Sequence, residues 1–257
     1  RILALNRETA RFYYSVLMSE AGAAGREYFS KRQLQASTIR HFGLGYSPPG
    51  RFALVDHLEK KGFTQQEMIL ANVAFQSRSG RAVDRFSGRV MFPIIDLRGN
   101  VVAFGGRTLG DDKPKYLNTA DTPVFNKGDM LFALNFAKNN NGGRLILCEG
   151  YMDVISLHQA GFTNAVATLG TALTPSQARL MSRYAKEVVV SYDSDGAGQK
   201  AAARAIPMLR SAGLLVKVLS IAGGKDPDEY IKTYGALRFK QMLDNCGNDV
   251  EYQLQKA

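Results

Sequence analysis

The residues best suited to chemistry are carboxylates that follow three short apolar runs in the second half of the chain. Glu149 stands directly after Cys148, and Asp153 comes one helical turn later. The motif DSDGAG occupies residues 193–198, and DPD occupies residues 226–228. Carboxylates that lie close together repel each other strongly, so a cluster of this kind requires a cation. Hard divalent ions suit such a cluster, because Mg²⁺ combines one or two carboxylates with phosphate oxygens.

The elements that must hold these carboxylates alternate between strand and helix from residue 144 onward. Short apolar strands separated by helices indicate a parallel sheet with crossover helices. The strands are predicted at residues 145–148, 165–168, 188–192 and 216–221. One connecting helix is predicted to start with a capping box formed by Thr174 and Gln177, with Pro175 at its first position. Because ligands bind beyond the carboxyl ends of such strands, the carboxylates are expected to converge at one edge.

Helix capping is the alternative explanation for these acidic residues, because the helix dipole favours negative charge near the first turn. For Asp153 and Asp228 the two explanations are equally supported by the sequence. Glu149, Asp193 and Asp195 are not expected to be needed as caps. A metal site is therefore the favoured interpretation of these three residues together.

The composition is that of a globular protein and excludes several classes. Hydrophobic residues make up 45% of the 257 residues and charged residues 22%, which argues against a disordered chain. No apolar run approaches the length of a membrane span, and the sequence has no signal-peptide pattern. Cys148 and Cys246 lie far apart without a CxxC motif, which excludes a disulfide framework and fits a reducing cytosol. The sequence also lacks a P-loop motif.

Positive charge is concentrated in the first half of the chain. The whole sequence has 33 Lys and Arg against 23 Asp and Glu, a net charge of +10. Residues 1–140 carry 20 basic and 12 acidic side chains, whereas residues 141–257 carry 13 and 11. This excess predicts a polyanionic partner such as a nucleic acid or a nucleotide.

The first half combines short helices with a β-hairpin. Asn6 is expected to cap the first helix. Thr64 and Glu67 form a capping-box pattern before a later helix. Two β-rich runs, at residues 89–95 and 101–108, are joined by the sequence DLRGN, which predicts a hairpin.

Taken together, these motifs resemble a known family. Three acidic motifs are similar to the signature of the toprim domain, which primases, topoisomerases and some nucleases share. They are EGYMD at 149–153, DSDGAG at 193–198 and DPD at 226–228. Four upstream motifs resemble the RNA polymerase signature of bacterial replicative primases of the DnaG type. They are DRF at 84–86, RVMFPI at 89–94, FGGR at 104–107 and PKYLN at 114–118.

The resemblance implies a polymerising site that uses two or more divalent ions, Mg²⁺ or Mn²⁺. Glu149, Asp193 and Asp195 are then the catalytic metal ligands. The acidic residues Asp153, Asp226 and Asp228 are secondary ligands or lie just behind the ligands. Seven residues of the basic segment are expected to bind nucleotide or template: Arg85, Arg89, Arg107, Lys115, Tyr116, Asn118 and Lys127. From the residue alone, Tyr116 fits the core equally well.

The predicted fold class is α/β, a toprim-type parallel sheet with flanking helices. A mixed α+β lobe with a basic groove is expected to precede it at residues 1–140, and the toprim metal-binding domain to occupy residues 141–232. Residues 233–257 are expected to begin a truncated helical region. The chain has no N-terminal Cys/His cluster, so the family's zinc-binding module is expected to be absent and no zinc is expected in this fragment.

The implied activity is template-directed synthesis of short RNA primers on single-stranded DNA, by a DNA-directed RNA polymerase of the nucleotidyltransferase class. The implied partners are single-stranded DNA, NTPs, the RNA primer and, through a C-terminal domain outside this chain, the replicative helicase. A bacterial cytoplasmic location at the replication fork is expected, without a membrane. Two alternatives stay open: a toprim nuclease or topoisomerase, and a non-catalytic nucleic-acid-binding toprim module.

Overall fold

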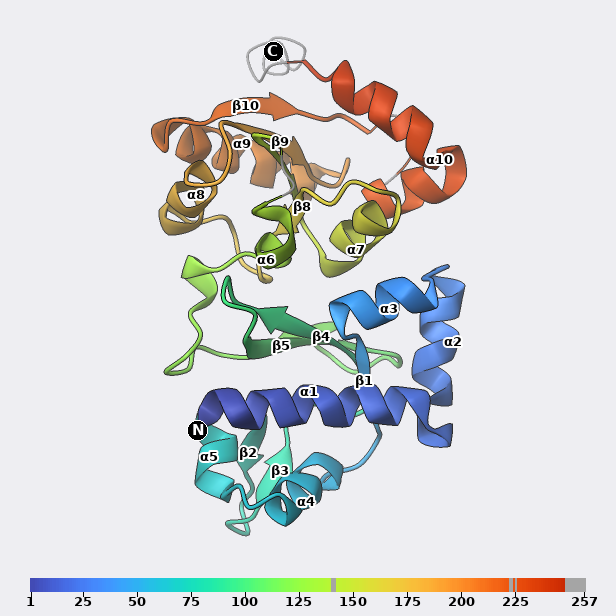
Figure 1. The fold of residues 1–257 in the computed structure, drawn as a ribbon, viewed down its shortest axis with the longest axis vertical. Helices are drawn as coiled ribbons and strands as arrows, with labels where there is room; N and C mark the ends of the chain where they lie inside the picture. The colour runs from blue at the N-terminus through green and yellow to red at the C-terminus, as the bar shows by residue number, and fades with distance from the viewer. Residues whose placement is uncertain (140–141, 222–223, 225, 248–257) are drawn as a thin grey trace. The chain divides into compact units, whose positions relative to one another are not determined.

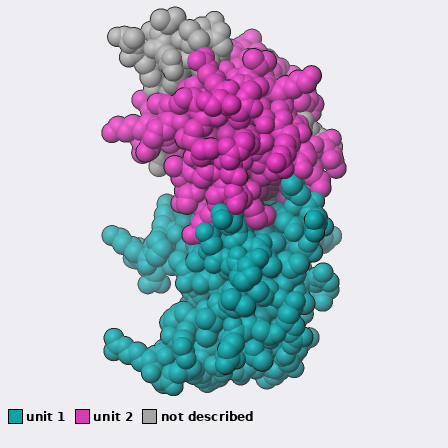
Figure 2. Space-filling model, turned by 90° about the vertical axis from the view of Figure 1, so that its left-hand side faces the viewer, with its two compact units in different colours: residues 1–126 teal, residues 127–257 magenta. Residues whose placement is uncertain are grey.

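The computed structural model describes residues 1–139, 142–221, 224 and 226–247. The chain forms two compact units, unit 1 (Arg1–Asn126) and unit 2 (Lys127–Ala257), which Figure 2 shows in different colours. Within the described ranges, no helix is long and apolar enough to cross a membrane.

Unit 1 packs helices around an antiparallel sheet with the strand order β1–β4–β5–β6, and β2 and β3 pair separately. Its elements are α1 (Ile2–Met18), η1 (Glu20–Gly22), α2 (Ala23–Lys31), α3 (Ala36–Phe42), β1 (Gly45–Ser47), α4 (Ala53–Lys60), α5 (Gln65–Leu70), β2 (Ala74–Gln76), β3 (Ala82–Asp84), β4 (Arg89–Ile95), β5 (Val101–Thr108) and β6 (Tyr116–Asn118). The predicted hairpin is confirmed, because β4 and β5 have the predicted bounds and pair antiparallel. β1 and β6 extend this hairpin on its two sides.

Helix α1 packs on this sheet and contributes to the core of unit 1. Leu5 and Tyr13 of α1 are buried in one cluster with Met91 and Phe104 of the sheet. The rings of Tyr13 and Phe104 meet edge to face, with their centroids 5.6 Å apart. Burial of such apolar side chains is the main favourable term that holds the helix to the sheet.

The expected cap at Asn6 is wrong. Helix α1 begins at Ile2, so Asn6 lies inside the helix, where it is buried. Its side-chain amide donates a hydrogen bond to the carbonyl of Val102 on β5, at 3.0 Å. A buried amide needs a partner, and here the partner is the backbone of the sheet rather than the end of its own helix.

Both predicted capping boxes are confirmed. Thr64 caps α5 and exchanges hydrogen bonds with Glu67. Thr174 caps α8 in the same way with Gln177, and Pro175 occupies the first helical position. These helix starts follow from local sequence, because each box satisfies two backbone N–H groups that a helix N-terminus leaves without partners.

Unit 2 is built on a parallel sheet with the strand order β10–β9–β7–β8. Its elements are η2 (Lys127–Asp129), α6 (Leu134–Ala137), β7 (Arg144–Cys148), α7 (Tyr151–Gln159), β8 (Ala165–Ala167), α8 (Pro175–Ser182), β9 (Glu187–Ser191), α9 (Gly196–Ser211), β10 (Leu215–Val218) and α10 (Pro227–Asp244). In Figure 1, α8 and α9 lie on one side of this sheet, and α7 and α10 lie on the other. The predicted parallel sheet is therefore confirmed.

The two central strands of this sheet, β7 and β9, are buried along nearly their whole length. Leu145, Ile146, Leu147 and Cys148 of β7 are fully buried, and β9 is buried in the same way at residues 188–191. Helices cover both faces of a parallel sheet, so its inner strands are continuous apolar runs rather than alternating ones.

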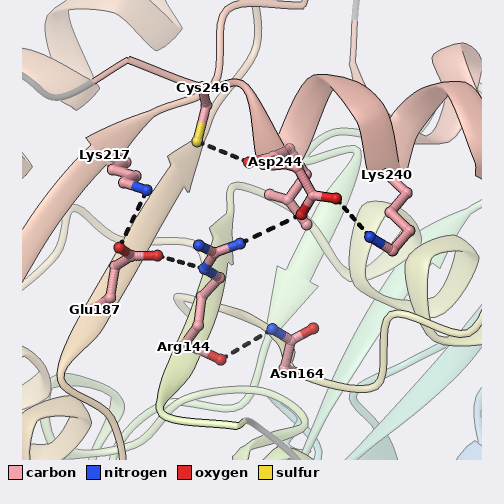
Figure 3. Close-up of polar contacts among 8 residues, drawn as sticks. Arg144, Asn164, Glu187, Lys217, Lys240, Asp244 and Cys246 are labelled. Atoms are coloured by element: carbon pink, nitrogen blue, oxygen red, sulfur yellow. Dashed lines mark hydrogen bonds and ion pairs between the residues drawn. The ribbon is translucent and has the colours of Figure 1, made fainter.

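Charged side chains pair at the amino ends of these strands. Arg144 at the start of β7 contacts the carboxylate of Glu187 at the start of β9, and Lys217 Nζ of β10 lies 3.3 Å from the same carboxylate. The Asp244 carboxylate at the end of α10 accepts a hydrogen bond from Lys240 and lies 3.8 Å from the Arg144 guanidinium. Figure 3 shows how this network joins α10 to the strands.

The three-domain division stays a prediction. Its first boundary, between residues 140 and 141, lies outside the described residues, as do residues 248–257 of the expected helical end. The compact units divide after Asn126, and α10 continues across residue 232 with a kink at Gly235.

Candidate active site

Glu149 lies at the carboxyl end of β7, in the middle of the unit 2 sheet. Its Oε1 accepts a hydrogen bond from the backbone N–H of Asp193, which follows the neighbouring strand β9, at 3.0 Å. The chain leaves β7 toward β8 on one side and returns to β9 on the other. Ligands bind at such topological switch points. Glu149 and Asp193 therefore meet at one edge, as the sequence predicted.

Gly198 lets helix α9 approach this edge closely. A Cβ atom at this position would lie 2.2 Å from the carbonyl oxygen of Asp193 and 2.7 Å from Glu149 Oε1. Both distances are below 3.0 Å, a limit that real Cβ atoms essentially never pass. The last glycine of the DSDGAG motif is thus required by space rather than by backbone conformation.

Asp195 is the N-cap of α9, which corrects the expectation that it has no capping role. Its Oδ1 accepts hydrogen bonds from the N–H groups of Ala197, at 3.0 Å, and Gly198, at 2.8 Å. The carboxylate is therefore oriented by the helix start as well as favoured by the helix dipole.

Burial and mutual repulsion perturb the acidic side chains at this edge. Asp153 on α7 is buried, which raises its pKa well above the usual range, and the charges of Asp226, Asp193 and Asp228 raise it further. Burial also raises the pKa of Glu149, followed by the charge of Asp193. These shifts record the cost of gathering like charges where water is partly excluded.

The two aspartates of the DPD motif have different environments. Asp226 is the N-cap of α10, and its Oδ1 accepts a hydrogen bond from Glu229 N at 2.8 Å. Asp228 is buried and accepts a hydrogen bond from the Ser156 hydroxyl of α7. The ammonium of Lys232 lies 2.6 Å from one Asp228 carboxylate oxygen and 2.7 Å from the other. Asp228 thus ties α10 to α7, with its charge balanced.

An open pocket of about 380 Å³ lies beside Glu149. Helix α9 forms one wall with Ala197, Ala201 and Arg204, and the loop after β8 contributes Thr168 and residues 170–173. The carboxylate edge therefore adjoins a space whose walls are mostly small or apolar residues, with two threonines and one arginine.

Three of the predicted template-binding residues share one face of the unit 1 sheet. Arg107 of β5 is directly opposite Tyr116 of β6, and Asn118 lies two residues further along the same strand. Residues opposite each other in an antiparallel pair lie on the same face. The Arg107 guanidinium lies 4.6 Å from the ring centroid of Tyr28 on α2, a cation–π contact that fixes its orientation.

Arg89 lies on the opposite face of the sheet from Arg107. It pairs with Thr108, one residue along β5 from Arg107, so the alternation of strand side chains turns it the other way. Arg89 is buried, and its Nη1 donates to the carbonyls of Gly106 and Pro114, at 3.2 and 3.0 Å. Burial lowers its pKa. These contacts hold the β5–β6 connection in place.

The remaining basic residues lie elsewhere. Arg85 follows β3 and is half-buried, which lowers its pKa, and its backbone N–H donates to Val73. Lys115 directly precedes β6. Lys127 opens unit 2 in the short helix η2, so the sequence-based grouping of all seven residues in one lobe differs from the division into compact units.

The chain is similar to known proteins over nearly its whole length. Residues 12–138 match the family "DNA primase catalytic core, N-terminal domain", and residues 146–231 match the family "Toprim-like". A DNA primase domain from Pseudomonas aeruginosa is 39% identical, has a TM-score of 0.91, and is covered over 82% of its length by the whole of this chain. The chain belongs to the DnaG-type primase family.

Further relatives agree with this membership. The primase polymerase domain from Mycobacterium tuberculosis is 32% identical with a TM-score of 0.92, and this chain covers 86% of it. A DNA primase from Clostridium acetobutylicum is 45% identical over 258 residues, which are 100% of this chain and 43% of that protein. The chain thus spans less than half the length of that full-length primase. A DnaG catalytic domain bound to single-stranded DNA is 35% identical, with a TM-score of 0.88.

The acidic edge of this primase core fits hard divalent cations. Its donors are carboxylate oxygens. Burial, and after it the charges of neighbouring carboxylates, raise the pKa values of Glu149 and Asp153, and a bound cation offsets both effects. Among the described residues, no group of three or more His, Cys, Asp or Glu side chains is arranged to hold a metal ion.

Three residues that contact predicted site residues, two in unit 2 and one in unit 1, were missed by sequence reasoning. Lys232 stands four residues after Asp228, a spacing that favours an ion pair on a helix, so the sequence did carry a signal for it. Ser156 and Tyr28 gave no such signal, because their partners Asp228 and Arg107 are distant in sequence.

Proposed function

We propose that this chain is the catalytic core of a primase, which synthesises short RNA primers on single-stranded DNA. The observation that carries the proposal is the meeting of Glu149 with the Asp193 loop at the switch point of a toprim sheet. A toprim nuclease or topoisomerase shares this acidic edge. Residues 12–138, however, match the N-terminal domain of primase cores, which favours primer synthesis over cleavage.

The reaction joins the 3′-hydroxyl of a primer to the α-phosphate of an incoming NTP and releases pyrophosphate. Two divalent ions, Mg²⁺ or Mn²⁺, supply activation of the attacking oxygen and stabilisation of the leaving oxygen when bound. Glu149, Asp193 and Asp195 are the proposed ligands of these ions. They extend from two neighbouring strands, and backbone N–H groups orient the carboxylates of Glu149 and Asp195 before any ion binds.

The other acidic residues support these three. Asp153 and Asp226 are proposed as further ligands, since they add negative charge at the same edge. Asp228 lies behind them, because Ser156 and Lys232 already engage its carboxylate. Its role is to hold the start of α10 against α7.

The basic residues bind phosphates of the incoming nucleotide and the template. Arg107, Tyr116 and Asn118 form one group on a single sheet face, where the guanidinium offers bidentate hydrogen bonds to phosphate. The positively charged side chains Arg85, Lys115 and Lys127 add to this binding. Arg89 contributes by holding the β5–β6 connection that carries Lys115.

The site chemistry and the family membership together suggest the proposed partners. They are single-stranded DNA, NTPs and the growing RNA primer, with the replicative helicase reached through a part of the protein outside this chain. The proposed place of action is the replication fork in the bacterial cytoplasm.

The purified chain, supplied with a single-stranded DNA template, labelled NTPs and Mg²⁺ or Mn²⁺, tests the proposal directly. We expect labelled RNA whose sequence depends on the template, with no cleavage of the DNA. DNA cleavage without RNA synthesis favours the nuclease or topoisomerase alternative. DNA binding with neither reaction, at every ion concentration tried, favours the non-catalytic module.

A further inference from the structure

The capping box of α8 makes contacts that a helix start does not need. Gln177 is completely buried. Its Oε1 accepts a hydrogen bond from Thr174 N at 3.0 Å, which completes the box. Its Nε2 donates two more hydrogen bonds, to the carbonyls of Lys127, at 2.9 Å, and Met130, at 2.8 Å. The Thr174 hydroxyl donates to the carbonyl of Gly128 between them.

These bonds engage three carbonyls in the turn where unit 2 begins, which we call the entry turn (residues 127–130). Directly after it, Phe132 exchanges two backbone hydrogen bonds with Ala167 of β8. Hydrogen bonds therefore hold the entry turn and the residues after it to the rest of unit 2 at two places, the start of α8 and strand β8.

The capping box of α5 shows that a helix start forms without hydrogen bonds to a distant turn. In α5 the corresponding residue is Glu67, whose carboxylate accepts a hydrogen bond from Thr64 N at 2.8 Å. Glu67 pairs with exposed Arg1. A carboxylate has no hydrogen to donate, whereas the amide of Gln177 has two. Either residue completes a capping box, but only the amide can also bind backbone carbonyls.

We propose that Gln177 is a positioning residue that fixes the entry turn to helix α8 and thereby holds Lys127 in place for template phosphates. The inference rests on the proposed function, because it assigns Lys127 to DNA binding. The amide acts on the backbone at Lys127 itself and at Met130, so its loss frees the segment that carries the lysine. These two hydrogen bonds are partly buried, and a carbonyl that loses its donor in such a place is costly, which favours opening of the turn.

Trypsin measures the anchoring independently of DNA, because it cleaves after lysine and the Lys127 carbonyl belongs to the bond that it cuts. Gln177→Glu keeps the acceptor for Thr174 N and loses both donated bonds. Cleavage of a locally opened segment follows the population of the open form. We expect cleavage after Lys127, followed by mass spectrometry, to accelerate about tenfold or more, because each lost hydrogen bond shifts the opening equilibrium severalfold.

Glu67→Gln is the matched control, since it makes the reverse exchange in a box that holds no distant turn. It should leave cleavage after Lys127 at the parent rate. A second pair covers the case in which the buried glutamate prevents folding. Thr174→Val loses the bond to the Gly128 carbonyl together with the cap, and Thr64→Val loses only a cap. Faster cleavage in Thr174→Val but not in Thr64→Val supports the anchor, and equal rates in both overturn it.

Binding of labelled single-stranded DNA at several salt concentrations then tests the positioning role. Lys127→Ala should reduce the salt slope of binding by roughly 0.7 if the lysine contacts one phosphate. Gln177→Glu should weaken binding in the same direction, and the double variant should bind no more weakly than Lys127→Ala alone. Additive losses, or no loss in Gln177→Glu, overturn the positioning role. Parent-like binding by Lys127→Ala refutes the proposed function of the lysine instead, while trypsin still decides the anchor.

Discussion

The two edges of the unit 2 sheet carry the same residue types with opposite electrostatic outcomes. At the amino edge, Glu187 contacts Arg144 and Lys217, and Asp244 contacts Lys240 (Figure 3). At the carboxyl edge, no lysine or arginine among the residues that the structure describes forms an ion pair with Glu149, Asp153 or Asp195. The same β7 connects both edges, with Arg144 at its start and Glu149 just beyond its end.

The contrast teaches which acidic clusters need an external cation. Hydrogen bonding from Lys240 lowers the pKa of Asp244, so that carboxylate is stabilised within the protein. Burial and neighbouring carboxylates raise the pKa of Glu149 and of Asp153, so those charges remain costly. Asp228 is instructive because Lys232 balances it, although it lies close to the same edge. Internal pairing is typical of a structural carboxylate, and the perturbed, unbalanced charges of Glu149 and Asp153 support the proposed ion site.

The largest expected effect is a loss of primer synthesis when a carboxylate at the carboxyl edge, but not at the amino edge, is neutralised. Asp193→Asn should reduce nucleotide incorporation by more than about 100-fold, since even residues behind metal ligands commonly contribute 10- to 100-fold. The fold should persist, because the backbone N–H of residue 193 still donates to Glu149. Primer synthesis and the thermal midpoint, measured on the same preparation, check this.

Asp244→Asn is the control at the amino edge and should synthesise primers at nearly the parent rate. Asp195→Asn gives a second comparison at the carboxyl edge, because asparagine caps helices as well as aspartate does. Incorporation by Asp193→Asn within about threefold of the parent, a difference below 1 kcal/mol in barrier height, would remove this residue from the metal ligands.

The second effect is stabilisation by the ion. At ten times its dissociation constant, Mg²⁺ should stabilise the folded parent by about 1.4 kcal/mol, which corresponds to roughly 3–6 °C in the thermal midpoint. Asp193→Asn should lose most of this shift. Glu187→Gln, a neutralised carboxylate at the amino edge, should keep it. Thermal scans with Mg²⁺ and with EDTA compare the three proteins, and an equal shift in all of them contradicts a metal site at the carboxyl edge.

The third effect concerns stability at the amino edge. Arg144→Met removes the cation that touches both Glu187 and Asp244, while Lys217 and Lys240 remain. The side chains of Arg144 and Glu187 are 30% and 17% exposed, so screening by solvent reduces the loss. We expect a decrease of about 1 kcal/mol, roughly 2–4 °C, with primer synthesis retained. Loss of synthesis at an unchanged midpoint would show that the two edges are not separate in function.

Sequence patterns predicted the parts of this molecule that depend on local order. The inner strands β7 and β9 of unit 2 are buried on both faces, so they stood out as apolar runs, and the residues after Cys148 and Tyr192 had to reach one edge. The two capping boxes were equally visible. Metal ligation and DNA binding by the individual residues stay predictions.

Features that depend on distant contacts could not be predicted in this way. Asparagine is a common N-cap residue, but the hydrogen-bond partner of Asn6 is Val102, which is 96 residues away in the sequence. Arg89 and Arg107 both looked like phosphate ligands, and their separation onto opposite faces depends on hairpin register, which an irregularity between Ile94 and Ile95 shifts. The capping role of Asp195 was missed for a different reason: it is a local contact, but a carboxylate that caps a helix and one that binds an ion have the same sequence pattern.

The smallest expected effect concerns pH in the absence of divalent ions. Ionisation of a carboxylate is expected to destabilise the fold at the carboxyl edge and to stabilise it at the amino edge. Burial, then the charge of Asp193, raises the folded-state pKa of Glu149. Its contribution to the free energy of unfolding therefore falls as pH rises from the unfolded value, about 4.3, through the raised one. The folded-state pKa of Asp244 is lowered by Lys240. Its contribution is complete above the unfolded value and is lost as pH falls through the lowered one.

Glu149→Gln in EDTA should therefore have a higher thermal midpoint than the parent at neutral pH, and the difference should vanish below about pH 4. Glutamine keeps the acceptor for Asp193 N, so the comparison isolates the charge. Asp244→Asn should have a slightly lower midpoint at neutral pH, and that difference should also vanish in acid. The Asp244 effect is the smaller one because solvent screens an exposed pair. A lower midpoint in both variants would mean that the charge of Glu149 is balanced internally, which removes its need for an ion.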